Sequence, residues 1–321
     1  MKRVCILIVA SFAGAASAAL AAWVYEGQWG SKGSGEGQFD SPTGISVSRA
    51  DRVYVADCYN DRVQYFTAEG DFLGTWGTEG SGNGQFNAPR CVAVSDEDIV
   101  YVTDGLNHRV QFFTRTGRFL GKWGTQGSGD GQFDSPTGIE VALTGVVYVS
   151  EGGNDRVQYF TPSGSFLGKF GSRGSGDGEF QNPYGLSVGP QGNIYVADMA
   201  NHRVQYFTSS GSFLGKWGSM GSGNGQFYYA GRLAGAPDGV VFVTDYANHR
   251  VQYFTSSGSF LGKFGSRGSG DGEFEFPTGI AVSPAGDHVY VVDRDNARVQ
   301  YFTYTTHVVP SSVGRIKALF K

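Results

Sequence analysis

The amino-acid sequence predicts an all-β protein: a six-bladed β-propeller of four-stranded antiparallel blades, whose last blade is closed by the N-terminal strand. Three observations lead to this prediction. A glycine-rich segment that ends in phenylalanine recurs at a constant spacing, each repeat holds four short segments of β character, and both ends of the chain carry an incomplete repeat. Repeated antiparallel sheets with complementary ends are expected to close into a ring.

The constant spacing is 47 residues, and the segment ANHRVQYFTSSGSFLGK stands unchanged at 200–216 and 247–263. A period of about 20–50 residues is typical of solenoids, propellers and other arrays. The chain has 51 glycines among 321 residues, which indicates that glycine punctuates an ordered chain. The glycine-rich segment ends at Phe39, Phe86, Phe133, Phe180, Phe227 and Phe274.

Each repeat contains four segments rich in β-branched and aromatic residues, and none has helical periodicity. Short links such as AEGD at 68–71 predict hairpins, so one repeat is expected to form a four-stranded meander. Alternation within RVQYF places apolar side chains on both faces of the sheet, as in a blade covered by two neighbours. In the first repeat the segments are GISV (44–47), VYVAD (53–57), RVQYF (62–66) and FLGTWG (72–77).

The two ends of the chain complement each other. Residues 25–30 align with the fourth segment of the first repeat, whereas the last repeat stops after its third segment at 298–302. We therefore expect the N-terminal strand to complete the sixth blade, with the propeller spanning residues 23–303 and a C-terminal tail at 304–321. The tail is expected to be a frayed terminus, with a short docking helix or a sorting signal as alternatives.

Residues 1–22 are typical of a signal peptide: Lys2 and Arg3 precede an apolar run that ends in small residues. Cleavage after either 16–18 or 19–21 fits the pattern, and an uncleaved membrane anchor is the alternative. Without Lys2 and Arg3 the chain has 23 basic and 29 acidic residues, a net charge of −6. We expect a secreted or periplasmic monomer, with no membrane insertion of the mature chain and no nucleic-acid partner.

The run NHRV at 107–110, 201–204 and 248–251, together with GSGDGQF and PTGI, resembles the NHL repeat family of six-bladed propellers, in particular exported bacterial members. The resemblance extends over residues 23–303. It implies the fold but not one function, because similar propellers include peptide-binding and RNA-binding modules, sensor domains and an amidating lyase.

A repeated acid–arginine pair, such as Asp57 with Arg62, is expected to hold a turn in every blade, because a catalytic centre is normally single. His108, His202 and His249 occupy one repeat position in three blades, so they are not expected to converge on a metal. The sequence therefore predicts neither a metal site nor a cofactor.

Two cysteines of the mature chain, Cys58 and Cys91, belong to neighbouring blades at the same end of the sheets. In an exported protein they are candidates for a disulfide, and two buried free thiols are the alternative.

Departures from the repeat mark the candidate ligand site, at one mouth of the central channel. Arginine and tyrosine are frequent in recognition surfaces, although drift within the repeat explains the same changes. The candidates at the openings of the first strands are Arg90, Tyr184 and Arg232, preceded in blade five by Tyr228 and Tyr229; those in turns are Tyr59, Tyr246 and Arg294.

These observations favour a non-catalytic module that binds a protein, peptide or glycan at the channel mouth. The sequence shows no isolated nucleophile paired with a base and no cluster of metal ligands. The alternatives are a lyase similar to peptidyl-hydroxyglycine amidating lyase and an RNA-binding NHL module.

Overall fold

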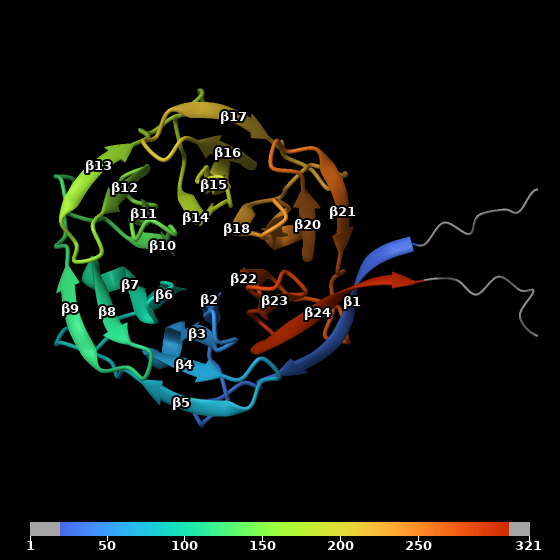
Figure 1. Ribbon diagram of the computed structural model, residues 1–321, viewed down its shortest axis with the longest axis horizontal. Helices are drawn as coiled ribbons and strands as arrows, with labels where there is room; N and C mark the ends of the chain where they lie inside the picture. Colours follow the sequence, from blue (N-terminus) through green and yellow to red (C-terminus); the bar gives the residue numbers. More distant parts are fainter. Residues whose placement is uncertain (1–19, 308–321) are drawn as a thin grey trace, which may run out of the picture.

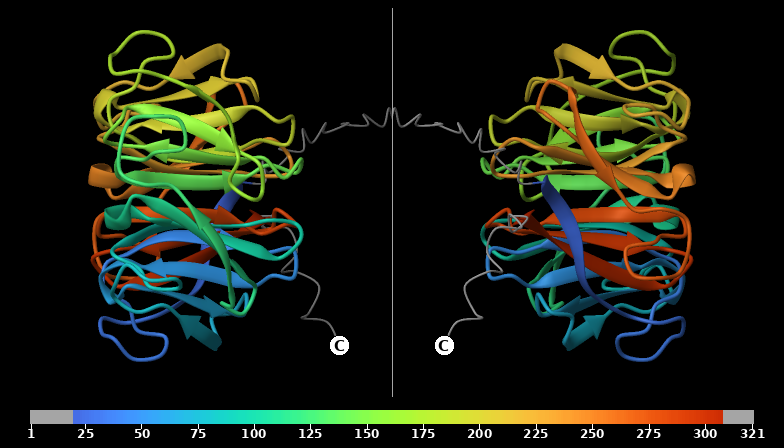
Figure 2. Two further views of the ribbon diagram at one scale, coloured as in Figure 1. Left: turned by 90° about the vertical axis from the view of Figure 1, so that its left-hand side faces the viewer. Right: turned by 90° about the vertical axis from the view of Figure 1, so that its right-hand side faces the viewer.

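The computed structural model describes residues 20–307 and confirms the predicted all-β architecture. Six four-stranded antiparallel sheets surround a central axis, with the first strand of each sheet innermost (Figure 1). Side views show the connections between strands gathered on the two flat faces of the ring (Figure 2). Within the described residues there is no helix long and apolar enough to cross a membrane.

The strands of the first three blades follow one another in sequence order. Blade one contains β2 (Pro42–Val47), β3 (Val53–Asp57), β4 (Arg62–Phe66) and β5 (Phe72–Trp76). Blade two contains β6 (Pro89–Val94), β7 (Ile99–Asp104), β8 (Arg109–Thr114) and β9 (Phe119–Trp123). Blade three contains β10 (Pro136–Val141), β11 (Val147–Glu151), β12 (Arg156–Phe160) and β13 (Phe166–Phe170).

Blades four and five repeat this order, and blade six combines both ends of the chain. Blade four contains β14 (Pro183–Val188), β15 (Ile194–Asp198), β16 (Arg203–Phe207) and β17 (Phe213–Trp217). Blade five contains β18 (Ala230–Gly235), β19 (Val241–Asp245), β20 (Arg250–Phe254) and β21 (Phe260–Phe264). Blade six contains β22 (Pro277–Val282), β23 (His288–Asp293), β24 (Arg298–His307) and β1 (Leu20–Trp29).

Short 3₁₀ turns join the second and third strands of four blades. Each ends at a residue in the left-handed conformation, which reverses the chain into the next strand. They are η1 (Cys58–Asn60), η2 (Gly105–Asn107), η3 (Met199–Asn201) and η4 (Tyr246–Asn248).

The pairing of β1 with β24 closes the ring, as predicted. The antiparallel register runs from Leu20 opposite His307 to Trp29 opposite Val299, so both strands extend beyond residues 23 and 303. Trp29 also packs against Phe66 of blade one, with ring centroids 5.8 Å apart. The N-terminal strand therefore belongs to blade six and also contributes to its interface with blade one.

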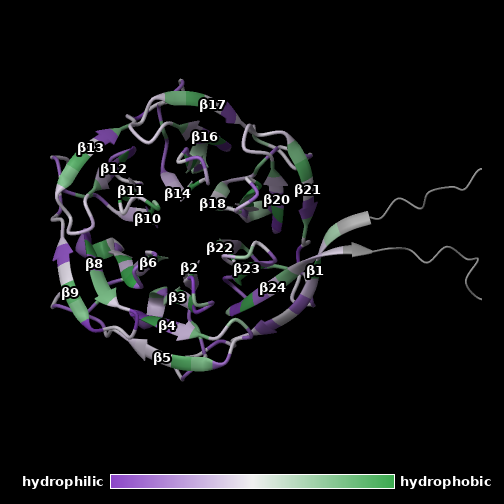
Figure 3. Cartoon of the chain, viewed as in Figure 1, coloured by the Kyte–Doolittle hydropathy of each residue, from purple (hydrophilic) through white to green (hydrophobic). Residues whose placement is uncertain are grey.

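The hydrophobic core lies between neighbouring blades. The phenylalanine that ends each glycine-rich link is fully buried, and Phe39 packs on Phe66 with centroids 5.7 Å apart. Gly30, at φ +102°, lies beneath Phe39, where a Cβ would come within 2.6 Å of the ring. Along the peripheral strand β5, partly buried residues alternate with exposed ones, and the hydropathy colouring shows both hydrophobic and hydrophilic stretches in the peripheral strands (Figure 3). The repeat thus buries apolar residues chiefly between sheets.

A buried polar network attaches each glycine-rich link to its blade. In blade one, Asp57 is fully buried and accepts hydrogen bonds from the Asp40 backbone N–H (2.8 Å) and from Arg62 Nε (2.8 Å). The Arg62 guanidinium then donates to the carbonyl oxygens of Ser34, Gly35 and Gln38, which lie in the link. The predicted acid–arginine pair is therefore the centre of a structural network, which recurs at Asp104, Glu151, Asp198, Asp245 and Asp293.

The three repeat histidines join adjacent blades and lie in separate interfaces. His202 Nδ1 accepts the backbone N–H of Tyr229 (3.0 Å), and His108 and His249 accept the equivalent N–H groups at Ser135 and Phe276. Asp61 and Asp155 do the same in blades one and three. Five blades therefore have a side-chain hydrogen-bond acceptor at this position, and blade six has Ala297 there.

Deleting residues 23–30 should destabilise the whole ring. We expect a single unfolding transition whose free energy of unfolding is lower than that of the parent by on the order of 5 kcal/mol. The deletion removes the packing of Tyr25 on Phe302 and of Trp29 on Phe66, and it leaves β24 as an open edge. Calorimetry of the deletion variant measures this. Glu26→Leu, which installs the residue found there in the other blades, is the control and should unfold like the parent; an unchanged melting temperature of the deletion variant would contradict the closure.

Acid should weaken the interface between blades four and five through His202. Burial lowers the pKa of His202 below its ordinary 6.5, so the folded state favours the neutral imidazole whose Nδ1 accepts the Tyr229 N–H. The hydrogen bond from the Tyr229 N–H to neutral His202 contributes about 1 kcal/mol to the free energy of unfolding. This contribution is complete above pH 6.5 and is lost as the pH falls through the lowered pKa of His202. Between pH 6.5 and pH 5, the free energy of unfolding of His202→Asp should fall less than that of the parent. Equal decreases in the two proteins would refute this role of His202.

Candidate functional site

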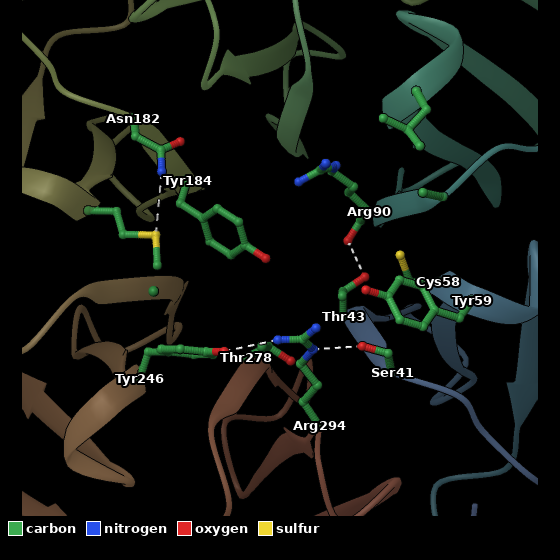
Figure 4. Close-up of a pocket in the computed structure, with 14 residues that line it drawn as sticks. Ser41, Thr43, Cys58, Tyr59, Arg90, Asn182, Tyr184, Tyr246, Thr278 and Arg294 are labelled. Carbon is green, nitrogen blue, oxygen red and sulfur yellow. Dashed lines mark hydrogen bonds between the residues drawn. The ribbon is translucent and has the colours of Figure 1, made fainter.

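A pocket of about 400 Å³ lies at the mouth of the central axis on the face that carries the 3₁₀ turns (Figure 4). The innermost strands supply Thr43, Arg90, Tyr184 and Thr278, and the turns supply further side chains. The complete lining is Ser41, Thr43, Cys58, Tyr59, Ala88, Arg90, Leu106, Asn182, Tyr184, Met199, Gly231, Tyr246, Thr278 and Arg294. We call it the mouth pocket.

Five of the eight ligand-site candidates line the mouth pocket: Tyr59, Arg90, Tyr184, Tyr246 and Arg294. Arg90 and Tyr184 point into it from opposite sides (Figure 4). Tyr59 is 65% exposed and forms part of the rim. The departures from the repeat in blades one, two, four, five and six therefore come together in space.

Arg294 is held in a fixed position on one side of the pocket. Its Nε donates to Ser41 Oγ (2.6 Å) and its Nη1 donates to the Tyr246 hydroxyl (2.9 Å). The exposed Asp295 carboxylate lies 3.9 Å from Arg294 Nε. Burial raises the pKa of Tyr246, so its hydroxyl remains protonated at neutral pH.

Arg232 lies beneath the pocket and spans the central axis. It starts from β18 in blade five, and its Nη2 donates to the carbonyl oxygens of Arg90 (2.7 Å) and Thr137 (3.1 Å) in blades two and three. Its guanidinium carbon lies 4.8 Å from the centre of the Tyr184 ring, a cation–π contact. Arg232 is only 4% exposed, so it forms a floor under the mouth pocket.

Tyr228 and Tyr229 lie outside the lining of the mouth pocket. Both rings pack around His202, with centroid distances of 5.6 and 4.9 Å. Their place is the link that enters blade five, where Tyr229 adopts φ +69°. The sequence placed them beside Arg232, but the chain turns between Tyr229 and Arg232 and separates their side chains.

Cys58 and Cys91 are buried free thiols, the second of the two alternatives considered from the sequence. Cys91 Sγ lies 3.9 Å from the Ile139 carbonyl oxygen of blade three, whereas Cys58 faces the mouth pocket. Burial raises the pKa of Cys58 to about 11, which keeps it as a thiol at neutral pH. The two sulfur atoms therefore belong to different environments.

A second pocket, of about 610 Å³, lies at the opposite end of the innermost strands. Its wall carries a valine from five blades, the ion pair of Arg49 with Asp96, and Glu140 of β10, whose carboxylate has no ion-pair partner among the residues 20–307. Burial raises the pKa of Glu140 from 4.5 to about 7. The other blades have Ser or Ala at this position, and comparing whole first strands, rather than only their openings, would have singled out Glu140.

Replacing Glu140 with Ser, as in blades one and four, should stabilise the protein at pH 8. The raised pKa means that the folded state retains a proton which the unfolded state releases, so the parent loses stability as the pH rises from 4.5 to about 7. We expect the free energy of unfolding of Glu140→Ser to exceed that of the parent by about 1–3 kcal/mol at pH 8 and to equal it at pH 4.5. Urea denaturation at both values measures it, with the exposed Glu97→Ser as control; a gain independent of pH would contradict the assignment.

Among residues 20–307, no group of three or more His, Cys, Asp and Glu side chains is arranged to hold a metal ion. The mouth pocket contributes arginine guanidinium groups, hydroxyls, a thiol and aromatic faces. This arrangement can bind a ligand by hydrogen bonds, charge and stacking.

Comparison with protein families identifies the repeats. An NHL repeat model matches residues 39–66, 86–113 and 180–207, and a model described as a 6-bladed beta-propeller matches residues 235–310. No characterised protein sequence matches the chain significantly.

Solved structures share the fold at low sequence identity. A streptogramin B lyase is 11% identical, covering 89% of this chain and 97% of its own, with a TM-score of 0.58. A gluconolactonase from Xanthomonas campestris is 13% identical, covering 84% and 88%, with a TM-score of 0.61. A chain of a nidogen/laminin complex is 14% identical, covering 73% and 83%, with a TM-score of 0.55. At such identities the likeness concerns the fold alone, and with the matched repeats it identifies this chain as a six-bladed β-propeller that contains NHL repeats.

Proposed function

We propose that this propeller is an exported, non-catalytic binding module whose mouth pocket receives part of a peptide, protein or glycan. The observation that carries the proposal is convergence. Five positions at which blades depart from one another, spread over more than 230 residues of sequence, line a single pocket. Drift in a repeat without a function would scatter such changes over the surface.

The chemistry of the lining supports binding. Tyr59 and Tyr184 present aromatic area, Arg90 and Arg294 present directional donors, and Leu106 adds an exposed apolar contact. Arginine and tyrosine contribute strongly to recognition surfaces because they combine large contact area with hydrogen bonds. The hydroxyls of Thr43 and Thr278 are already engaged with neighbouring backbone carbonyls, which leaves the arginines and tyrosines to meet a ligand.

The same lining supports binding over acid–base catalysis. It contains neither a histidine nor a carboxylate, and the raised pKa values of Cys58 and Tyr246 oppose their ionisation at neutral pH. The lyase and the lactonase with this fold show that propellers support enzymes, but at 11% and 13% identity their likeness to this chain concerns the fold alone.

The test is ligand capture with the intact chain. The immobilised protein is exposed to the extracellular fraction of its source and to synthetic peptide and glycan arrays. We expect a ligand whose binding is lost in the double variant Arg90→Ala, Arg232→Ala and retained in Arg49→Ala, which removes an arginine that lines the opposite pocket. A ligand that binds the double variant unchanged would place the site elsewhere, and stoichiometric zinc or calcium in the purified protein would favour an enzyme.

A further inference from the structure

The mouth pocket concentrates positive charge without a matching carboxylate. Arg90 and Arg294 line it, Arg232 forms its floor, and its lining contains no aspartate or glutamate. All three arginines lie close enough to Cys58 to favour its anionic form, which shows that their charges act on the same small volume. Two carboxylates lie outside this lining: Asp61 accepts the Ala88 N–H, and the exposed Asp295 pairs with Arg294, so Arg90 and Arg232 remain without an acidic partner in the part of the chain that the structure describes.

The guanidinium of Arg232 is buried with part of its bonding capacity unused. Nη2 has two carbonyl acceptors, but Nε and Nη1 have no hydrogen-bond partner, and the residue is only 4% exposed. Arg90 Nε also lacks a partner. A buried charged donor without an acceptor is costly, so a group that brings acceptors and negative charge would stabilise this arrangement.

The fold itself does not require these two arginines. At the position of Arg232, four other blades have glycine, and at the position of Arg90, three blades have threonine. Those blades form the same sheets and the same links. Arg90 and Arg232 are therefore additions to a ring that closes without them, in contrast to the arginines of the repeated acid–arginine networks.

We propose that the mouth pocket binds an oxyanion, a carboxylate or phosphate group of its ligand, through Arg90 and Arg232; this rests on the proposed function of the same pocket. The planar guanidinium offers paired donors that match two oxygens of such a group. The Tyr184 ring lies over the Arg232 guanidinium, so an anion reaches Nε and Nη1 only if this ring moves, whereas Arg90 lines the pocket directly. Arg294, already bonded to Ser41 and Tyr246, adds charge from the side.

The experiment measures binding of defined probes to the full chain by calorimetry and by thermal shift. The probes are inorganic phosphate, an N-acetylated tripeptide with a free C-terminal carboxylate, its C-terminal amide, a galacturonate trimer and a galactose trimer. The variants are R90T and R232G, alone and together, which install the residues of the other blades. R49T, which removes an arginine paired with Asp96 at the opposite pocket, is the control.

We expect at least one anionic probe to bind the parent and R49T, to raise their melting temperature with concentration, and to bind R90T/R232G at least tenfold more weakly. Preference for the free tripeptide over its amide identifies a peptide terminus as the source, preference for galacturonate identifies an acidic sugar, and binding of phosphate alone identifies a phosphate group. Without probes, R232G should melt at or above the temperature of the parent, because it removes an unsatisfied buried charge.

Other outcomes overturn the proposal. If the amide or the galactose trimer binds as well as its acidic counterpart, or if no anionic probe binds, the oxyanion assignment is wrong, while the pocket remains a candidate for neutral ligands. If an anionic probe binds R90T/R232G as tightly as the parent, the site lies elsewhere and the proposed function of this pocket fails as well. Circular dichroism establishes that each variant is folded, and R90T, which changes a partly exposed residue, serves if R232G is unstable.

Discussion

The structure depends on a buried carboxylate that appears once in every blade. It lies at the end of the second strand, neutralises the arginine that begins the third, and through it holds the carbonyl oxygens of the glycine-rich link; in blade one these residues are Asp57, Arg62 and the link at Ser34–Gln38. An exposed loop of glycine and serine has little order of its own. The network supplies that order, sets the spacing of successive sheets and places the link phenylalanine in the apolar interface.

The blades share one scaffold but differ in the side chains that line the central axis. The residues at the start of the innermost strands differ between blades, and Arg90, Tyr184 and Arg232 occupy positions where other blades have threonine or glycine. One end of the axis is polar and rich in arginine, and the other is lined by five valines together with Glu140 and the Arg49–Asp96 pair. Arg232 separates the two ends, because it reaches from blade five to the opposite wall.

The fold could be predicted almost completely, because a period of 47 residues repeats each local signal six times and the two ends of the chain match. The candidate site could be predicted in part. A repeat gives the position of Arg90 or Tyr246 within a blade, and hence its face, but it does not show that Tyr229 turns toward His202 or how far the flexible side chain of Arg232 extends. Those outcomes depend on backbone turns and rotamers that equivalent blades do not share.

The pairing of β1 with β24 has a consequence for the order of folding. Trp29 and Val299 are partners in one ladder although about 270 residues separate them along the chain. The strand β1 can therefore pair only after β24 has been synthesised. Contacts between such distant segments carry a large loop-closure cost and form late. Until then, β2–β23 can form successive hairpins from local contacts, and the apolar faces between blades six and one remain exposed to solvent. A nascent chain that stalls before β24 would expose that gap to other chains.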